Sequence, residues 1–414
     1  MSVALTALRT RGLGRSGGFA LWAIAGAWLL CASASHAADA DAPAALKTAQ
    51  VALISLADDP RFQARQLELR YPGHPAGRLD AAAQLAVNDS TRRLKRAGWA
   101  LQWRSVELPN AAQLDAAMRG LSAQGVRYAL LDLPAELVPP AVAASAGKTL
   151  LFNVSASADG LRGAACAANL FHTIPSDAMA ADALAQYLAA RNWRKALVLQ
   201  GPLPADAGLD AAWVRAAKRY GIKTTAHKAF KLSGNPAERE LANTRLLTND
   251  REHDIVAVWD SDGEFARTLP YATQWPRPVV GSFGLMASAW HAQWPRNGGP
   301  QLSRRFRELS GRDMLSPDWA AWLAVKTIAE LLPEVGDQET PAQAEHLRGD
   351  FFIAGYKGPR LSYRAWNGQL RQPMVLAHAD GVIGAAPVEG VLHPVETMDT
   401  LGIDQAENTC RTQP

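Results

Sequence analysis

The chain has few cysteines and only short apolar runs. Three cysteines occur in 414 residues. The apolar stretch from Phe19 to Cys31 has 13 residues, too few to cross a hydrocarbon layer of about 30 Å comfortably. We therefore expect that this stretch does not span a membrane, with a retained membrane anchor as the alternative.

The motifs of common enzyme classes are missing as well. The sequence has no glycine-rich dinucleotide fingerprint, no phosphate loop, no HExxH and no Cys/His metal array. The stretch Gly-Ser-Phe-Gly at 281–284 superficially resembles a nucleophile elbow, but the serine of that motif stands third of five residues. We therefore expect a protein that is not an enzyme and binds no metal.

The first 37 residues have the pattern of an export signal. Arg9, Arg11 and Arg15 precede the apolar stretch, and small residues follow it at 35–37. Leu30 stands before Cys31, where a lipoprotein signal needs a small residue. The pattern predicts a cleaved signal peptide at 1–37 and a soluble, exported chain that starts near Ala38.

The positive charge of the chain belongs partly to this segment. The formal net charge is +4, but removal of residues 1–37 takes away three arginines and no acid, which leaves 40 Lys and Arg against 39 Asp and Glu. This balance gives no support to nucleic-acid binding. The densest basic cluster, at 92–96, is better explained as a solvated helix face than as a phosphate site.

Periodicity in the mature chain predicts an α/β protein with two lobes. About 375 residues are too many for one compact core. Strands are expected at 51–56, 101–107, 128–133 and 150–154, with helices at 79–97, 111–124 and 135–146. The pattern then begins again, with helices at 184–190 and 207–220 and strands at 196–200, 225–230, 255–259 and 279–282. This alternation predicts parallel sheets with flanking helices, in two successive copies.

Two later features suggest that the chain crosses between the lobes more than once. Residues 316–332 have Trp319, Trp322 and Ile328 on one face, which predicts a long helix packed on the first lobe. Asn367-Gly368 predicts the turn of a β-hairpin within 353–384. No low-complexity linker separates the lobes, so several crossings would form a hinge.

Ligands of parallel sheets bind beyond the carboxyl ends of the strands. In two facing lobes these ends border one cleft, and the residues that follow the expected strands are our candidates for ligand binding. They are Asp58, Arg61, Asp132, Asn153, Ser155 and Ser157 in the first lobe, and Gln200, Asp206, Trp259, Asp260 and Ser282 in the second. Each also has a structural explanation: Asp132 as a helix cap, Asn153 and the serines as turn residues, and Trp259 as a core side chain.

Two cysteines stay in the chain after removal of the signal. In an oxidising compartment, Cys166 and Cys410 are expected to form a disulfide that fixes the C-terminal tail to the middle of the chain. The alternative is two unrelated small apolar residues.

Several motifs resemble a known family. The stretch Phe-His-Thr-Ile-Pro-Ser-Asp at 171–177, the order of elements and the closing hairpin resemble type I periplasmic binding proteins of the leucine-binding group, which serve ABC transporters. Five further segments resemble the subfamily found with pyrroloquinoline quinone (PQQ) dependent alcohol dehydrogenase systems: 71–75, 161–163, 318–322, 366–373 and 399–402.

The resemblance implies a two-lobed type I fold, a periplasmic location, a permease as partner and a monomer. It implies a first lobe from 46–168 with 285–345, a second lobe from 169–284 with 350–385, and a tail at 386–414. A PQQ-dependent dehydrogenase is a further expected partner.

The long segment 57–78 departs from the amino-acid-binding relatives. It carries Arg61, Arg65, Arg70 and Arg78, and guanidinium groups bind carboxylates in bidentate fashion. We therefore expect PQQ, a planar tricarboxylate, or a related anionic aromatic compound as a transported ligand rather than as a catalytic cofactor. The alternatives are surface arginines with an amino acid, short alcohol or organic acid as ligand, or an interaction protein of the dehydrogenase with a vestigial cleft.

Overall fold

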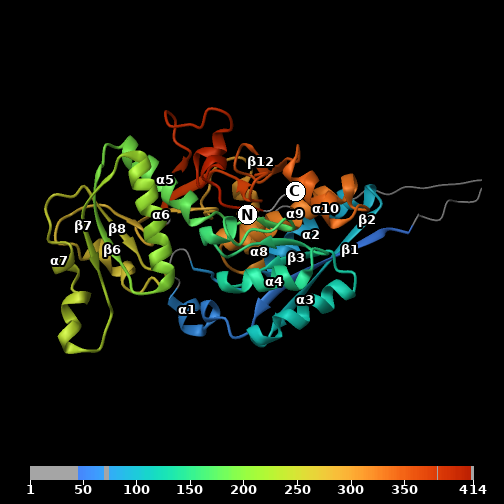
Figure 1. Ribbon diagram of the computed structural model, residues 1–414, viewed down its shortest axis with the longest axis horizontal. Coiled ribbons are helices and arrows are strands. Elements are labelled where there is room, and N and C mark those ends of the chain that lie inside the picture. Colours follow the sequence, from blue (N-terminus) through green and yellow to red (C-terminus); the bar gives the residue numbers. More distant parts are fainter. Residues whose placement is uncertain (1–44, 70–73, 380, 412–414) are drawn as a thin grey trace, which may run out of the picture. The chain divides into compact units, whose positions relative to one another are not determined.

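The computed structural model describes residues 45–69, 74–379 and 381–411, so the predicted signal peptide lies outside the described residues. The expected α/β class with parallel sheets and flanking helices is confirmed (Figure 1). In the described part of the chain, no helix combines the length and the apolar character that a membrane crossing needs.

The first sheet is entirely parallel. Its order is β2 (Trp99–Leu108), β1 (Lys47–Leu56), β3 (Tyr128–Leu131), β4 (Leu150–Asn153) and β5 (Leu170–His172). Successive residues of a strand face opposite sides of a sheet, and β1 follows this rule. Leu53 packs with helices α2 (Asp80–Arg96), α8 (Gly299–Ser310) and α9 (Ser316–Val335), whereas Ile54 packs with α3 (Leu114–Ala123) and α4 (Val138–Ser145) on the other face (Figure 1).

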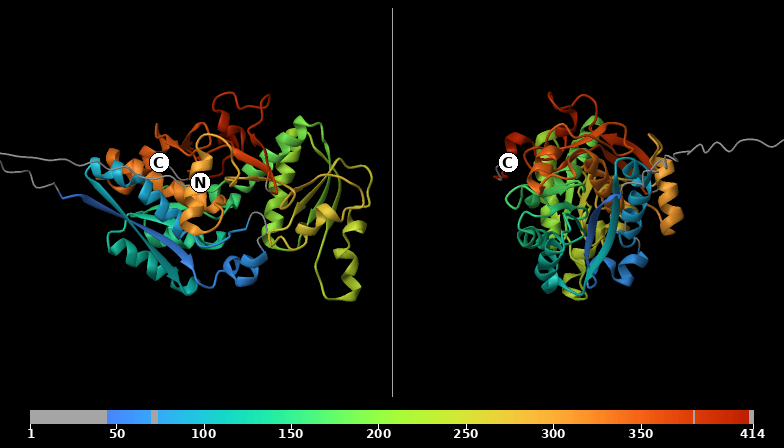
Figure 2. Two further views of the ribbon diagram at one scale, coloured as in Figure 1. Left: turned by 180° about the vertical axis from the view of Figure 1, so that it is seen from behind. Right: turned by 90° about the vertical axis from the view of Figure 1, so that its right-hand side faces the viewer.

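The second sheet is parallel except at one edge. Its order is β15 (Gly381–Ala386), β14 (Met374–His378), β10 (Leu285–Ser288), β9 (Val279–Gly281), β8 (Ile255–Trp259), β6 (Lys195–Gln200) and β7 (Lys223–Ala229). The strands β14 and β15 run antiparallel to their neighbours. Helices α5 (Asp177–Ala190) and α6 (Pro204–Tyr220) cover one face of this sheet (Figure 2).

The first residues of two helices are set by capping hydrogen bonds, which the apolar periodicity of the sequence does not reveal. The helix α5 begins at Asp177 rather than at 184, because the Ser176 hydroxyl accepts a hydrogen bond of 3.2 Å from the Met179 N–H. Helix α9 begins at Ser316, where the Asp318 carboxylate accepts from the Leu315 N–H at 2.9 Å. Three shorter α-helices are α1 (Ala64–Leu69), α7 (Thr244–Leu247) and α10 (Thr340–Arg348).

The predicted hairpin is present but shorter than expected. The strand β12 (Arg360–Tyr363) pairs with only two residues, β13 (Leu370–Arg371), and with β11 (Ile353–Ala354) on its other side. The following strand β14 leaves the hairpin and joins the second sheet. The hairpin itself packs with the core of the first lobe through Leu361, Tyr363 and Leu370, whereas the sequence prediction assigned 350–385 to the second lobe.

The sheets also place the lobe boundaries differently from the sequence prediction. Strand β5 belongs to the first sheet, so that sheet extends to His172 instead of ending at 168. Strand β10 belongs to the second sheet, which extends to Ser288 instead of 284. The chain passes between the sheets at 173–176, at 289–298 and at 372–373.

Candidate functional site

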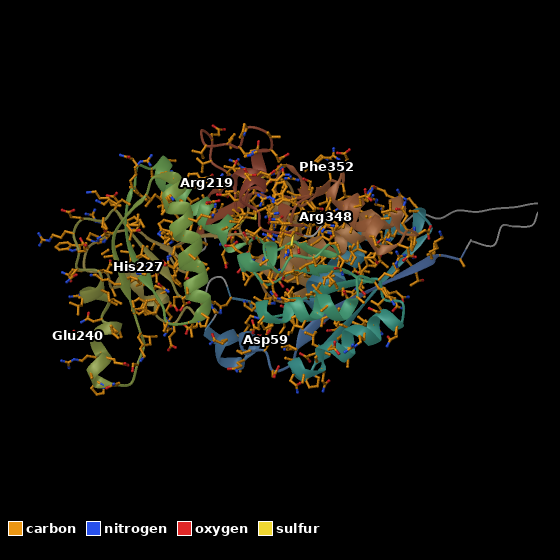
Figure 3. The ribbon with its side chains drawn as sticks, in the orientation of Figure 1. Asp59, Arg219, His227, Glu240, Arg348 and Phe352 are labelled. Carbon is orange, nitrogen blue, oxygen red and sulfur yellow. A yellow bond between two sulfur atoms is a disulfide. The ribbon has the colours of Figure 1, made fainter. Side chains whose placement is uncertain are left out.

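In the first lobe, a cluster of charged side chains follows the carboxyl ends of β1 and β3. Arg61 lies between two buried carboxylates: its Nη2 atom is 2.6 Å from Asp59 and 3.0 Å from Asp132. Asp59 lies in the loop after β1 (Figure 3) and caps the short helical turn that begins at Pro60. One guanidinium thus neutralises part of the charge of two acids.

The pKa of Asp132 reflects this environment. Burial raises it above the usual value, and the charge of Arg61 and the hydroxyl of Ser155 act in the opposite direction. The pKa of Arg61 is raised: its own burial acts to lower it, but the charge of Asp132 together with Asp59 outweighs that effect. Arg61 therefore stays cationic and its strongest partners belong to the chain itself.

Arg78 is also engaged within the chain. Its guanidinium donates to the Leu56 carbonyl at 2.8 Å, lies 3.0 Å from Glu107 and stacks 4.0 Å from the centroid of the Phe62 ring. Glu107 is half exposed, so this ion pair is accessible to solvent. Arg65 lies on α1, where only its backbone is described, and Arg70 lies outside the described residues.

The remaining candidates of the first lobe lie around the turn after β4. Asn153 is fully buried and donates to the Ala156 carbonyl at 2.7 Å, and its Oδ1 atom accepts from the Ala156 N–H at 3.0 Å. This is the geometry of a turn residue. Ser157 hydrogen-bonds to Asp177, whose pKa burial raises to about 6. Asp58 is exposed.

In the second lobe, two buried carboxylates lie at the ends of β6 and β8. Asp206 accepts hydrogen bonds from the Leu203 and Ser261 N–H groups at 2.9 and 2.6 Å. Asp260 accepts from the Ala266 N–H at 2.7 Å, and its own N–H donates to the Ser282 hydroxyl at 2.8 Å. The structure thus brings three predicted residues together: Asp206, Asp260 and Ser282.

Burial raises the pKa of Asp260 to about 7, and the nearby carboxylates of Asp262 and Asp206 act in the same direction. Trp259 is buried and packs against Trp213 with ring centroids 5.5 Å apart. Gln200 is half-buried at the end of β6. Within the described residues, no group of three or more His, Cys, Asp and Glu side chains is arranged to hold a metal ion.

One contact joins the two groups of strand ends. His74, in the long loop after β1, hydrogen-bonds to the backbone of Ser261 and faces the charge of Asp262, both of which follow β8. Burial lowers the pKa of His74, and these two partners oppose that shift. The long loop after β1 in the first lobe therefore reaches the loop after β8 in the second.

Sequence reasoning missed Asp59, His74 and Asp262. The Asp-Pro pair at 59–60 is a helix-start signal that predicts a capping role for Asp59. The pairing of His74 with the loop after β8 has no local signal, because it depends on how two distant loops are placed. A hollow of about 430 Å³ lies at the amino ends of β1 and β3, and its lining includes none of the predicted site residues.

Comparison with solved structures identifies the architecture. A periplasmic binding protein of Burkholderia mallei has a TM-score of 0.64 at 11% identity, over 89% of this chain and 100% of that one. The fold is that of type I periplasmic binding proteins. A protein of Brucella ovis that binds leucine, isoleucine, valine, threonine and alanine has a TM-score of 0.65 at 14% identity, over 80% of this chain and 89% of that one.

A third structure with this fold holds an aromatic acid. It is a solute-binding protein of an ABC transporter from Rhodopseudomonas palustris in complex with 3,4-dihydroxybenzoic acid, with a TM-score of 0.61 at 12% identity, over 82% of this chain and 94% of that one. No family model matches the sequence, and no curated protein matches it. The predicted two-lobed fold is thus confirmed.

Proposed function

We propose that this protein is a periplasmic solute-binding protein that delivers its ligand to the permease of an ABC transporter and catalyses no reaction. The observation that carries the proposal is the contact of His74 with Ser261 and Asp262. It joins the loops that follow β1 and β8, and parallel sheets bind their ligands among the loops beyond the carboxyl ends of their strands.

The export pattern at 1–37 supports the location. Three arginines, an apolar stretch and a small-residue site are the features of a cleaved signal peptide. A soluble, monomeric chain in the periplasm is the form in which such a protein would meet its permease.

The mechanism that we propose is lobe closure. The ligand binds one lobe first, and the second lobe then closes over it by rotation about the segments 173–176, 289–298 and 372–373. A differential affinity of about 5.5 kcal/mol shifts a two-state equilibrium from 1:99 to 99:1. The permease would then recognise the closed form.

For the ligand we propose a small anionic aromatic compound, with PQQ first. The fold accommodates a carboxylated ring in the Rhodopseudomonas protein. In this chain, a ligand carboxylate could replace Glu107 as the partner of Arg78 at low cost, because Glu107 is half exposed. Arg61 would have to give up the buried Asp132, which costs more.

The pairing of Arg61 favours a second candidate function. Its guanidinium is already engaged by Asp59 and Asp132, as expected of a cleft that no longer binds an anion. In that case the protein would act as an interaction partner of a PQQ-dependent dehydrogenase. An amino acid, short alcohol or organic acid as ligand of the same fold is a further alternative.

Titration of the purified protein with PQQ, followed by tryptophan fluorescence and thermal shift, tests the ligand. We expect saturable quenching at micromolar PQQ, with weaker binding by Arg78→Ala and unchanged binding by Arg92→Ala, because Arg92 is exposed on α2. Absence of quenching and of a thermal shift would exclude PQQ. Co-purification with the dehydrogenase would then support the second function.

A further inference from the structure

The C-terminal tail, defined here as residues 387–411, is attached to the second lobe along much of its length. Leu401 is fully buried in the core formed by α5, α6 and the second sheet. The Tyr220 hydroxyl donates to the Thr400 carbonyl at 3.1 Å, and the Gly402 N–H donates to Asp182 at 2.7 Å. Tyr220 and Asp182 belong to α6 and α5, so the tail is fixed to both helices.

The same segment binds the hairpin of the first lobe. Asp399 accepts from Arg364 at 2.8 Å and from Arg371 at 2.9 Å. Arg364 is 1% exposed and also donates to the Leu401 carbonyl at 2.5 Å. Both arginines belong to the β12–β13 hairpin, whose Tyr363 packs in the first core. Asp399 is thus bound to the first lobe and the Leu401 side chain is buried in the second, although only Thr400 lies between them.

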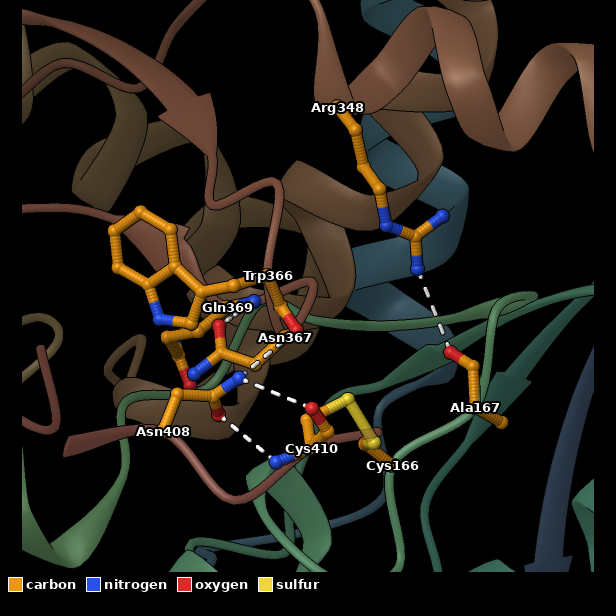
Figure 4. The surroundings of a disulfide bond; sticks show 8 residues. All are labelled: Cys166, Ala167, Arg348, Trp366, Asn367, Gln369, Asn408 and Cys410. Carbon is orange, nitrogen blue, oxygen red and sulfur yellow. Dashed lines mark hydrogen bonds between the residues drawn. A yellow bond between two sulfur atoms is a disulfide. The ribbon is translucent and has the colours of Figure 1, made fainter. Parts of the chain in front are cut away.

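A disulfide closes the end of the tail onto the first lobe. Cys410 is bonded to Cys166, which lies in the loop between β4 and β5 (Figure 4). The side-chain amide of Asn408 donates hydrogen bonds of 3.4 Å to the carbonyls of Trp366 and Cys410. Leu401 and Cys410 are nine residues apart, and nine residues span at most about 30 Å when fully extended. This length is an upper limit on the separation of the two attachment points.

Two of the crossings between the lobes lie side by side. Gln372, in the crossing at 372–373, donates to the Thr173 carbonyl at 2.8 Å in the crossing at 173–176. Gln369 donates to the His172 and Ile174 carbonyls at 3.2 and 3.1 Å, and Arg162 donates to Gln369 at 2.8 Å. At each of the three crossings, the two lobes are joined covalently by the main chain. The tail adds a fourth connection, which a disulfide completes.

We propose that the tail is a covalent strap that limits how far the two lobes open, and that reduction of the disulfide releases it. A dithiol supplies the two electrons and two protons: one of its thiolates attacks a sulfur of the Cys166–Cys410 bond, and its second thiol resolves the mixed disulfide. The products are two cysteine thiols and the oxidised dithiol. Both cysteines are partly exposed, so a reductant can reach them.

Release of the strap has two expected consequences. In the ligand-free protein, the lobes separate further. The closed population therefore falls, and the apparent ligand affinity decreases in proportion to it, by about threefold or more. The second consequence rests on the proposed solute-binding function, whereas the first is independent of it.

Small-angle X-ray scattering and hydrogen exchange of the ligand-free protein test the strap. We compare the oxidised protein, the protein reduced with dithiothreitol and the double variant Cys166→Ser/Cys410→Ser, below their unfolding temperatures. The expected result is a larger radius of gyration and exchange at least tenfold faster at 399–410 and 173–176 in both reduced forms. Equal scattering and equal exchange in the oxidised and reduced forms would overturn the proposal.

Asp399→Asn keeps the disulfide and weakens only the contact with Arg364 and Arg371. Its scattering is expected to match that of the oxidised protein, because the covalent limit persists. If this variant opens as far as the reduced forms, the ion pairs and not the disulfide limit the motion, and the proposal is wrong. Because these measurements use no ligand, failure to find a ligand leaves their result intact.

Discussion

Arg61 shows how the acids at the ends of β1 and β3 are balanced. It is 28% exposed, while the side chains of Asp59 and Asp132 are 0% and 2% exposed. Removal of a cation from buried carboxylates leaves their charge uncompensated, which costs more than the ion pair itself contributes. The stability of this region therefore depends on one side chain.

We predict that Arg61→Ala lowers the free energy of unfolding by about 2 to 3 kcal/mol, below the figure for a fully buried pair because Arg61 is partly exposed. Chemical denaturation measures this change, and Arg92→Ala, on the exposed face of α2, is the matched control. Addition of Asp132→Asn is expected to restore part of the loss. A change within about 0.5 kcal/mol for Arg61→Ala would contradict this account.

Asp260 gives the second prediction at this scale. Its pKa is about 7 in the folded protein, above the usual value, so the folded state binds more protons than the unfolded state between about pH 4 and pH 7. Stability from this group is therefore present at low pH and lost as pH rises through 7. Asp260→Asn removes that dependence.

Denaturation at pH 5 and pH 8 checks the prediction. The wild-type protein is expected to lose about 2 kcal/mol more than Asp260→Asn over this interval, because the pKa of Asp260 lies about two pH units above the lower pH. Asp177 has a pKa of about 6 and adds a dependence in the same direction, which both proteins share. Identical pH profiles of the two proteins would show that Asp260 ionises normally.

At the scale of elements, the β12–β13 turn is the point where the hairpin meets the first sheet. Gly368 has φ +67°, and its carbonyl accepts a hydrogen bond of 2.9 Å from the His172 N–H at the end of β5. A Cβ atom at this position would lie 2.5 Å from the Leu170 carbonyl oxygen. The turn thus requires glycine for its conformation and for its close approach to the sheet.

Gly368→Ala is expected to cost more than about 2 kcal/mol, because the left-handed conformation and the clash add. Gly390→Ala is the matched control: its φ is +93° and no atom lies within 4 Å of the added Cβ, so only the conformational cost of about 1 kcal/mol applies. Thermal denaturation compares the two. Equal losses would mean that the backbone at Gly368 moves freely away from β5.

The elements with a regular apolar pattern were predictable from the sequence. In α9, Trp319, Trp322 and Ile328 are all buried, as their spacing indicates. The departure of β14 from the hairpin could not be predicted. The alternation of Val375 and Ala377 with their neighbours along the chain fits a strand of the hairpin and a strand of the second sheet equally well. The ion-pair partners of Arg61 could not be predicted either, since they depend on the path of the loop after β1.

At the scale of the whole molecule, the chain has the fold of type I periplasmic binding proteins, with the loops after β1 and β8 in contact at His74 and Asp262. The fold could be predicted because two successive α/β patterns and several motifs agreed. The ligand could not be predicted, because proteins that share this fold carry different side chains at equivalent strand ends. Of the arginines that suggested an anionic ligand, Arg61 and Arg78 have acidic partners within the chain.

Calorimetric titration of the purified protein with PQQ, aromatic acids, amino acids, short alcohols and organic acids tests the central claim most directly. The proposed function predicts that one of these classes binds at a single site, with a negative heat-capacity change as the lobes close and bury apolar surface. If the folded protein binds no member of the panel, the claim that it captures a solute is contradicted.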